Sequence, residues 1–270
     1  MIFPNKADND QSKNIFKNVK SNFILSKVFH TLSKKKLLKI IKCNRELKKR
    51  ININVKDYKE YSEIYSSIEI EILPLINKYG KFINIIKEDE RYYHIYFDNN
   101  KEEIKRVYFN KNEQIKKIKI IIDYQVKSFE YLFYARDCIE SINFKKFNRN
   151  NIENMNCMFY RCSSLKKINF FNFNTNNVTN MDSMFYGCSS LKELNLSKFN
   201  TSNVSNMKNM FRECSSLKEL NLSNFNTNNV TNMSHMFSKC SPLEELNLFN
   251  FNIKNEINMQ CMFNGCSDEI

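Results

Sequence analysis

The sequence is poor in the residues that usually build sharp turns and active sites: its 270 residues include three glycines, three prolines and three histidines. Three glycines cannot form the glycine-rich loop that binds nucleotide phosphates. The turns must therefore depend on asparagine, which is abundant here and tolerates turn geometry. The histidines, His30, His94 and His235, show no arrangement of a nucleophile with its base. These absences argue against an enzyme.

Long apolar runs are also missing. No segment approaches the roughly 20 apolar residues that span a bilayer. The first ten residues lack the basic and apolar regions of a secretory signal. We therefore expect no membrane span and a cytoplasmic location. The alternative is the cell surface, if the N-terminus is incomplete.

The net charge of +13 is unevenly distributed. Residues 1–125 hold 27 Lys and Arg against 16 Asp and Glu, whereas residues 126–270 hold 15 against 13. The basic stretch from Lys34 to Arg50 has the charge to contact nucleic acid or anionic lipid. Interspersed charge of this kind is, however, usual on solvated surfaces. We therefore do not expect nucleic-acid binding.

A repeat of 26 residues dominates the C-terminal half. The sequence from Asn177 to Ser202 returns almost unchanged from Asn203 and again from Asn229. The column residues at this spacing are Met155, Met181, Met207, Met233 and Met259, and Cys162, Cys188, Cys214, Cys240 and Cys266. A fixed period of this length indicates stacked supersecondary units, which usually provide a binding surface and only rarely an active site.

Each repeat contains two patterns. The apolar positions at helical spacing are Val178, Met181, Met184, Phe185 and Cys188. They predict a short helix with one apolar face. Leu194 and Leu196 alternate with polar residues and predict a strand. The expected fold is therefore an α/β repeat solenoid, a leucine-rich-repeat array of strand and short-helix units behind an N-terminal cap.

The pattern changes along the chain and suggests four parts. These are a disordered tail at 1–20, a helical segment at 21–65, a small antiparallel β-meander that caps the array at 66–110, and the repeat array at 111–270. The meander would be built from strand-like runs at 68–72, 81–87, 92–97 and 104–109, which turn-like acidic or Asn-rich segments separate.

The cysteines predict a buried column of free thiols, because five of the nine occupy one repeat position and cysteine packs as a small hydrophobe. Zinc is the alternative. Cys157 with Cys162 and Cys261 with Cys266 have tolerable spacing, but no partnering pairs repeat beside them. We expect neither a metal nor a cofactor.

The solvent side of the predicted strands is the candidate surface for a protein partner. Its residues, called here the repeat face, are Lys167, Asn169, Phe171, Glu193, Asn195, Ser197, Glu219, Asn221, Ser223, Glu245, Asn247 and Phe249. Stacking should align the asparagines in columns, one of them starting at Asn169 and another at Asn174. We expect these columns to stabilise turns and edges, and stacked amides can also hydrogen-bond along a column.

The run from Asn177 to Leu191 reads Asn-Val-x-x-Met-x-x-Met-Phe-x-x-Cys-x-x-Leu, and Leu-x-Leu-x-x-Phe follows from Leu194 to Phe199. This pattern resembles the BspA-type leucine-rich repeat, also called the Mycoplasma lipoprotein-type or DUF285 repeat. The match is strong over 151–270 and weak over 115–150. The resemblance implies a surface or adhesion protein of bacteria, or a protein of protists, with no catalytic residue in the repeat.

A second resemblance concerns the N-terminal helical pattern. Its apolar residues are Ile24, Leu25, Val28, Phe29, Leu32, Leu37 and Leu38. The pattern is similar to an F-box, which implies a Skp1-like partner bound through residues 21–50. The Leu-Pro and Trp usual in that motif are missing, and an unspecialised pair of capping helices is the simpler interpretation.

The sequence thus predicts a non-enzymatic scaffold for protein–protein interaction that uses the repeat face. The alternatives are a substrate-recognition adaptor of a ubiquitin ligase and a surface adhesin.

Overall fold

The computed structural model describes residues 63, 66–98, 100–241, 243–253 and 257–266. The chain divides into two compact units, residues 1–65 and 66–270. The expected disordered tail at 1–20 and, apart from Glu63, the helical segment at 21–65 lie outside the described residues. The fold described below is that of the second unit.

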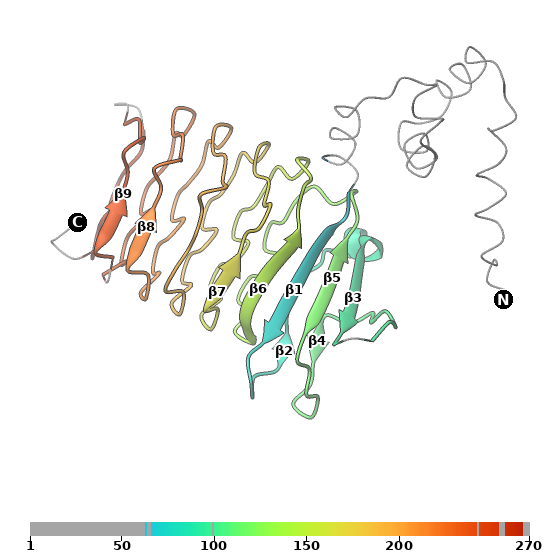
Figure 1. Ribbon diagram of the computed structural model, residues 1–270. Helices are drawn as coiled ribbons and strands as arrows, with labels where there is room; N and C mark the ends of the chain where they lie inside the picture. Colours follow the sequence, from blue (N-terminus) through green and yellow to red (C-terminus); the bar gives the residue numbers. More distant parts are fainter. Residues whose placement is uncertain (1–62, 64–65, 99, 242, 254–256, 267–270) are drawn as a thin grey trace, which may run out of the picture. The chain divides into compact units, whose positions relative to one another are not determined.

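Short strands and a 3-10 helix make up the regular structure of this unit (Figure 1). In chain order they are β1 (Ile68–Pro74), β2 (Gly80–Lys81), η1 (Lys87–Tyr92), β3 (Tyr93–Phe97), β4 (Tyr108–Phe109), β5 (Ile118–Ile122), β6 (Ile139–Lys146), β7 (Lys167–Asn169), β8 (Glu219–Asn221) and β9 (Glu245–Asn247).

β1 lies at the centre of a five-stranded sheet with the order β3-β5-β1-β6-β7. Ile68, Ile70 and Ile72 alternate with glutamates and are fully buried, because successive side chains of a strand point to opposite faces. β5 and β6 flank β1 in antiparallel pairing, so that Ile70 lies opposite Ile120 on one side and Phe144 on the other. The sequence alternation of β1 therefore fills the core from the middle of the sheet.

The expected sequential meander over 66–110 is wrong. β1 pairs with β5 and β6, and β3 pairs with β5, whereas β2 and β4 pair with each other in a separate sheet. The runs at 81–87 and 104–109 contribute only the short strands β2 and β4. The reason is burial: β5 and β6 present apolar residues opposite every buried isoleucine of β1, and this long-range packing outweighs pairing between neighbours in the sequence.

A parallel register of 26 residues carries the fold from this sheet into the repeats. β6 pairs with β7 so that Ile142 lies opposite Ile168, and β8 pairs with β9 at the same offset. Single bridges continue the offset through Ser128, Asn154, Asn180, Asn206, Asn232 and Asn258. Each repeat therefore makes one circuit and lies directly beside the next one (Figure 1).

The apolar positions at helical spacing are buried as expected, but their backbone forms no helix. The N–H groups of Met181 and Phe185 donate to the carbonyls of Asn206 and Met210 in the next repeat, at 3.0 and 2.9 Å. An α-helix would use those N–H groups for bonds to residues four positions earlier in its own segment. The bonds between repeats therefore replace the bonds that would have made a helix.

Two left-handed positions in each repeat also exclude a helix. Ser183 and Gly187 have φ angles of 54° and 67°. The positions equivalent to Gly187 keep this conformation even where they carry a large side chain, as at Arg161 (52°) and Glu213 (62°). A right-handed helix needs a φ near −60° throughout. The segment therefore folds as consecutive tight turns.

The expected α/β repeat solenoid of strand and short-helix units is thus wrong. No described residue from 111 to 266 is helical. The strands also do not join into one ladder, since β7 ends the five-stranded sheet and β8 and β9 form a sheet of their own. Between them, residues 193–195 adopt no strand.

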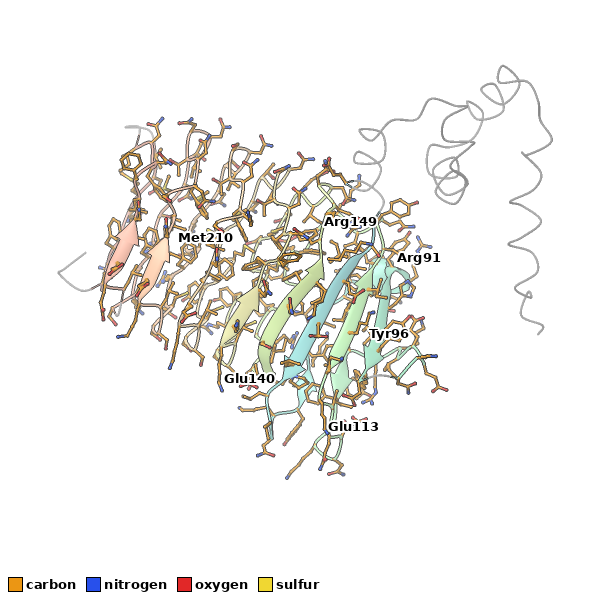
Figure 2. The ribbon with its side chains drawn as sticks, in the orientation of Figure 1. Arg91, Tyr96, Glu113, Glu140, Arg149 and Met210 are labelled. Atoms are coloured by element: carbon orange, nitrogen blue, oxygen red, sulfur yellow. The ribbon has the colours of Figure 1, made fainter. Side chains whose placement is uncertain are left out.

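Stacking aligns identical buried side chains of successive repeats in columns. Figure 2 draws the side chains on the ribbon and labels Met210, which belongs to one of these repeats. Phe159, Phe185 and Phe211 follow one another with ring centroids 5.5 and 5.6 Å apart and ring planes within 6° of parallel. Aromatic rings at such separations attract each other beyond the gain from burial alone. The phenylalanine column therefore links successive repeats through the core.

The predicted buried cysteine column is confirmed for Cys162, Cys188, Cys214 and Cys240, whereas Cys266 is half-buried. Cys188 and Cys214 are fully buried, and their thiols donate to the carbonyls of Phe159 and Phe185 in the preceding repeat, at 3.2 and 3.1 Å. The cysteines in the described part of the chain are free thiols. Each thiol thus adds a second hydrogen bond to a buried carbonyl that already accepts a backbone N–H, from Cys162 at Phe159 and from Cys188 at Phe185.

Met207→Asp should destabilise the unit by several kcal/mol, because Met207 is fully buried and the change places an unpaired carboxylate in the core. Lys208 is half-buried, and Lys208→Asp should cost about 1 kcal/mol or less. Urea denaturation of the two variants measures the difference. Equal losses of unfolding free energy in the two variants would show that the side chain of Met207 does not face the core.

Alkaline pH should also lower stability, through the cysteine column. Burial raises the pKa of Cys162 and of Cys240 to about 12 from the ordinary value of 9.0. Thiols of the unfolded chain ionise near that ordinary value while the buried ones stay protonated, so the free energy of unfolding should fall as pH rises above about 9. The pKa of Cys214 is also raised well above 9.0 by burial.

The matched control for this pH dependence is Cys214→Ala. It removes one titrating thiol, so the free energy of unfolding should fall less steeply with pH, by up to about 1.4 kcal/mol per pH unit. Urea denaturation between about pH 8 and pH 10 measures both slopes. Identical slopes in the two proteins would contradict a contribution from the buried thiol.

Candidate functional site

Every residue of the repeat face reaches solvent: Ser223 is half-buried and the others are exposed. The outward orientation follows from strand alternation, because Ile168 and Leu220 point inward between exposed neighbours in β7 and β8. Leu194 is also buried between exposed Glu193 and Asn195, although that segment is not a strand. The face therefore continues across the gap between the two sheets.

The asparagines of the repeat face hold turns within their own repeats. The side-chain oxygen of Asn195 accepts a hydrogen bond from the N–H of Ser197 at 3.0 Å, and Asn221 does the same with Ser223. Asn169 and Asn247 make the same bond two residues on. Asn side chains commonly hold turns this way, so the predicted role in turns is confirmed. The structure shows no amide-to-amide bond within this column among the described residues.

Hydrogen bonds between side-chain amides of neighbouring repeats do occur, but they join asparagines at different positions of the repeat. The side-chain nitrogen of Asn200 donates to the side-chain oxygen of Asn176 in the preceding repeat at 3.0 Å. Buried Thr175 donates to the carbonyl of Asn200 at 2.8 Å. Hydrogen bonds between repeats therefore fix the turn that follows the repeat face, in addition to the bonds within each repeat.

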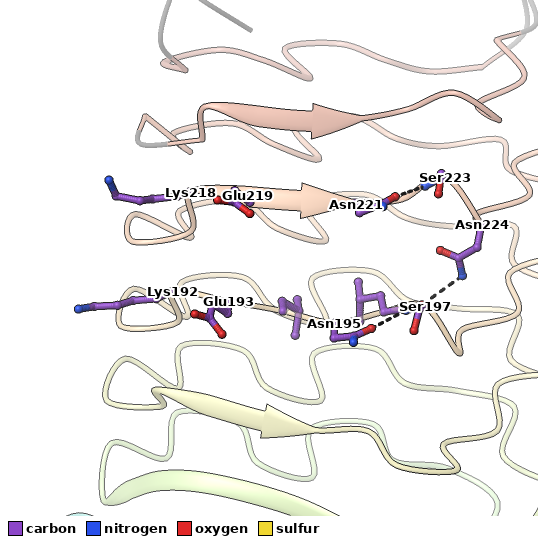
Figure 3. A pocket seen from close by; sticks show the side chains of 11 residues that line it. Lys192, Glu193, Asn195, Ser197, Lys218, Glu219, Asn221, Ser223 and Asn224 are labelled. Atoms are coloured by element: carbon purple, nitrogen blue, oxygen red, sulfur yellow. Dashed lines mark hydrogen bonds between the residues drawn. The ribbon is translucent and has the colours of Figure 1, made fainter.

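Two hollows lie along the repeat face between neighbouring repeats. One of about 690 Å³ joins the repeats of Lys167 and Glu193, and the next, of about 660 Å³, joins those of Glu193 and Glu219. Figure 3 shows the second hollow, with Asn224 at one end. The Asn224 side-chain nitrogen donates to the carbonyls of Leu196 and Phe199 at 3.1 and 2.9 Å, which fixes this end of the hollow.

Ion pairs connect some repeats at the border of the face. Lys166 pairs with Glu140 at 2.9 Å, and Lys218 pairs with Glu244 at 3.4 Å. These side chains are at least about one-third exposed, so solvent screening leaves each pair worth little to stability.

The glutamates of the face itself have no such partner. Within the described part of the chain, Glu193, Glu219 and Glu245 take part in no ion pair. Glu219 and Glu245 lie directly opposite each other in the register of β8 and β9. Like charges placed opposite each other in neighbouring strands are destabilising. The repeat therefore maintains a column of exposed glutamates without ion pairs among the described residues, although Lys192 and Lys218 line the same hollow beside them.

Exposed phenylalanines lie on the outer repeats of the face. Phe171 is 62% and Phe249 is 87% exposed, whereas Ser197 and Ser223 occupy the same position in the repeats between them. The face thus has a polar centre, where exposed glutamates alternate with lysines, and an apolar side chain towards each end.

The sequence matches the family model described as "Mycoplasma protein of unknown function, DUF285" over residues 100–190 and 166–269. The match covers more than half of the chain. This chain belongs to the DUF285 family. No curated protein and no solved structure matches it. The described residues of this DUF285 chain include no helix long and apolar enough to cross a membrane.

Sequence analysis missed a second surface column of the DUF285 repeats. Tyr134, Tyr160 and Tyr186 stack with centroids 4.8 and 4.6 Å apart, and Arg161 and Arg212 each lie 5.6 Å above a tyrosine ring of this column. Their spacing of 26 residues was visible in the sequence. The stacked rings cover each other's faces, so the column mainly braces the edge of the repeats.

The two described histidines of this DUF285 chain lie in different elements, one in β3 and one in a turn of the repeats. His94 lies 3.2 Å from Glu103 and 3.5 Å from Asp123, on the partly exposed side of the five-stranded sheet. His235 occupies a turn, where its N–H donates to the carbonyl of Gln260. Within the described residues, no group of three His, Cys, Asp or Glu side chains is placed to hold a metal ion.

Several sequence predictions fall on residues that the structure leaves undescribed. His30, Cys43, the basic stretch from Lys34 to Arg50, and the F-box-like segment with its Skp1-like partner at 21–50 lie outside the described residues. They stay predictions.

Asn169→Ala should lower the free energy of unfolding by about 1 kcal/mol, because it removes the acceptor for the Phe171 N–H in the turn after β7. Asn169→Asp keeps that acceptor beside Lys167 and should change stability by a few tenths of a kcal/mol. Chemical denaturation of both variants checks the difference. If the two variants lost the same stability, the side-chain bond would not be what holds this turn.

Proposed function

We propose that this DUF285 protein is a non-enzymatic scaffold that binds a protein partner through the repeat face. The observation that carries the proposal is the column of Glu193, Glu219 and Glu245, which is exposed and without ion pairs among the described residues. A folded chain gains nothing from like charges held in register, whereas a basic partner would convert them into favourable contacts.

The geometry beside the glutamates supports this proposal. The hollows between repeats adjoin the glutamate column and are lined by turns that Asn195 and Asn221 hold in place. A face built on such fixed turns loses little conformational freedom on binding. The exposed Phe171 and Phe249 offer apolar anchors towards the two ends of the face. Aromatic anchors around a polar centre are common in protein interfaces.

Repetition favours an extended partner with basic residues at regular spacing. Three successive repeats offer the same acidic group, at Glu193, Glu219 and Glu245, beside the same amide, so that several weak contacts can act together when the ligand spans them. Complementary charge would also accelerate the encounter and make it sensitive to salt.

Changing Glu193, Glu219 and Glu245 together to Lys should weaken binding of such a partner at least about tenfold and make it less sensitive to salt, because the change reverses the charge of the column. The side chains are exposed and unpaired among the described residues, so the circular dichroism spectrum should stay unchanged. The assay compares partners recovered from source-cell extract by the two proteins, followed by titration of each purified partner.

The matched control changes Glu90, Glu102 and Glu153 to Lys. These exposed glutamates lie outside the repeat face, and the substitution alters the net charge by the same amount. Binding should survive in this control. A partner that binds both triple variants as well as it binds the original protein would contradict the assignment of the repeat face.

The ubiquitin-ligase adaptor, the adhesin and the cytoplasmic location stay predictions. No observation on the described residues favours one of them over the scaffold.

A further inference from the structure

A separate pocket lies away from the repeat face, at the end of the five-stranded sheet where β1 leads into β2 and β4 leads into β5. Its volume is about 700 Å³, and its walls are the loop after β1, residues 75–79, and the loop after β4, residues 110–117. We call it the loop pocket. Figure 2 shows Glu113 and Glu140, which both line it, at this end of the sheet.

Backbone bonds hold both loops of the loop pocket in shape. The N–H of Leu75 donates to the carbonyl of Cys138, the residue before β6, at 2.8 Å, which ties the first loop to the sheet. In the second loop, the N–H of Glu113 donates to the carbonyl of Asn110 at 3.0 Å, and the Glu113 carboxylate accepts the N–H of Asn110 at 2.7 Å. Two guanidinium nitrogens of Arg106 donate hydrogen bonds to the same carboxylate. The walls are therefore formed before any ligand arrives.

The first wall exposes apolar side chains that the fold does not cover. Ile76 is 81%, Tyr79 53% and Leu73 41% exposed, and all three line the pocket above the buried ring of Phe109. Single exposed apolar residues are normal on a protein surface, but a contiguous group around a hollow marks a binding site. Covering apolar surface stabilises a complex in proportion to the area removed from water.

The charge around the loop pocket is unbalanced and positive. Its two carboxylates are already paired, Glu113 with Arg106 and Glu140 with Lys166. Lys78 is paired with Asp137 at 3.3 Å.

By contrast, the ammonium groups of Lys111 and Lys116 have no hydrogen-bond or ion-pair partner among the described residues. Both side chains are exposed and line the pocket. The free charge available to a ligand is therefore cationic, next to an apolar wall.

We propose that the loop pocket binds a small amphiphilic anion, a molecule with an apolar body and one anionic head group. The body covers Ile76, Tyr79 and Leu73, and the head group is recognised by Lys111 and Lys116. A volume of about 700 Å³ lies in the range of pockets for small molecules, which are mostly apolar with a few polar groups that select the ligand. The site does not depend on the repeat face, so either assignment can fail without the other.

Calorimetric titration with a matched ligand series tests this assignment. Decanoate, decanol and decylammonium share one apolar body and differ in head-group charge. Decanoate should bind saturably at one site and at least about tenfold more tightly than decanol, the difference expected from one charge-assisted contact. Decylammonium should bind more weakly than decanol. An absence of saturable decanoate binding, or tighter binding of decylammonium, would overturn the assignment.

Two pairs of charge reversals locate the site. Lys111→Glu with Lys116→Glu should weaken decanoate binding at least about tenfold and change decanol binding by less than about twofold. Lys101→Glu with Lys127→Glu makes the same change in net charge on exposed lysines outside the pocket, and decanoate binding should stay within about twofold. Equal losses in the two pairs would show attraction to the overall charge, which contradicts a built site.

The apolar wall has its own variant. Ile76→Ser should weaken decanoate and decanol alike, because it removes apolar contact for the body that they share. Ile86→Ser is the control, since Ile86 is also exposed, at 63%, and lies outside the pocket. Unchanged binding in Ile76→Ser would overturn the placement of the apolar body.

Discussion

Backbone hydrogen bonds from each repeat to the next are the interaction on which the rest of this structure depends. The N–H groups of Met181 and Phe185 reach carbonyls 25 residues further along the chain, and equivalent bonds recur throughout the array. They impose the 26-residue register that places Ile142 opposite Ile168 and aligns every later repeat. Because a backbone N–H makes one good bond at a time, these bonds also exclude a helix in the same segment.

This register has opposite consequences inside and outside. In the core it places identical side chains in stabilising contact. Examples are the parallel rings of Phe159, Phe185 and Phe211 and the thiols that donate to the preceding repeat. At the surface the same alignment sets Glu219 opposite Glu245, where like charges repel. The core therefore stabilises an arrangement that leaves its exposed glutamates without partners. That link between core packing and surface charge is why the repeat face is the natural place to seek a partner.

The loop pocket has a different origin. It is formed by unique loops at the end of the five-stranded sheet, where no repeat imposes a pattern. Its apolar wall and its unpaired lysines occur once within the described residues, so it suits one specific small ligand, whereas the repeat face suits an extended one. A DUF285 chain with both surfaces combines a repeated recognition element with a single site that is independent of it.

The sequence by itself determined the period of 26 residues, the buried and exposed positions within each repeat, the cysteine column and membership of the DUF285 family. Each of these depends on the type and spacing of residues, which can be read locally. The use of asparagine in turns also followed from residue chemistry, as Asn195 shows.

Only the tertiary structure decided that the described residues from 111 to 266 form no helix, that β1 lies at the centre of its sheet, and where the loop pocket forms. The apolar spacing from Val178 to Cys188 suits a helix and a stack of turns equally, because both bury the same side chains. The choice depends on where each backbone N–H finds its acceptor, and for Met181 that acceptor lies in the next repeat. Likewise, the isoleucines of β1 are matched by β5 and β6, strands distant in sequence that become neighbours only when the sheet is assembled.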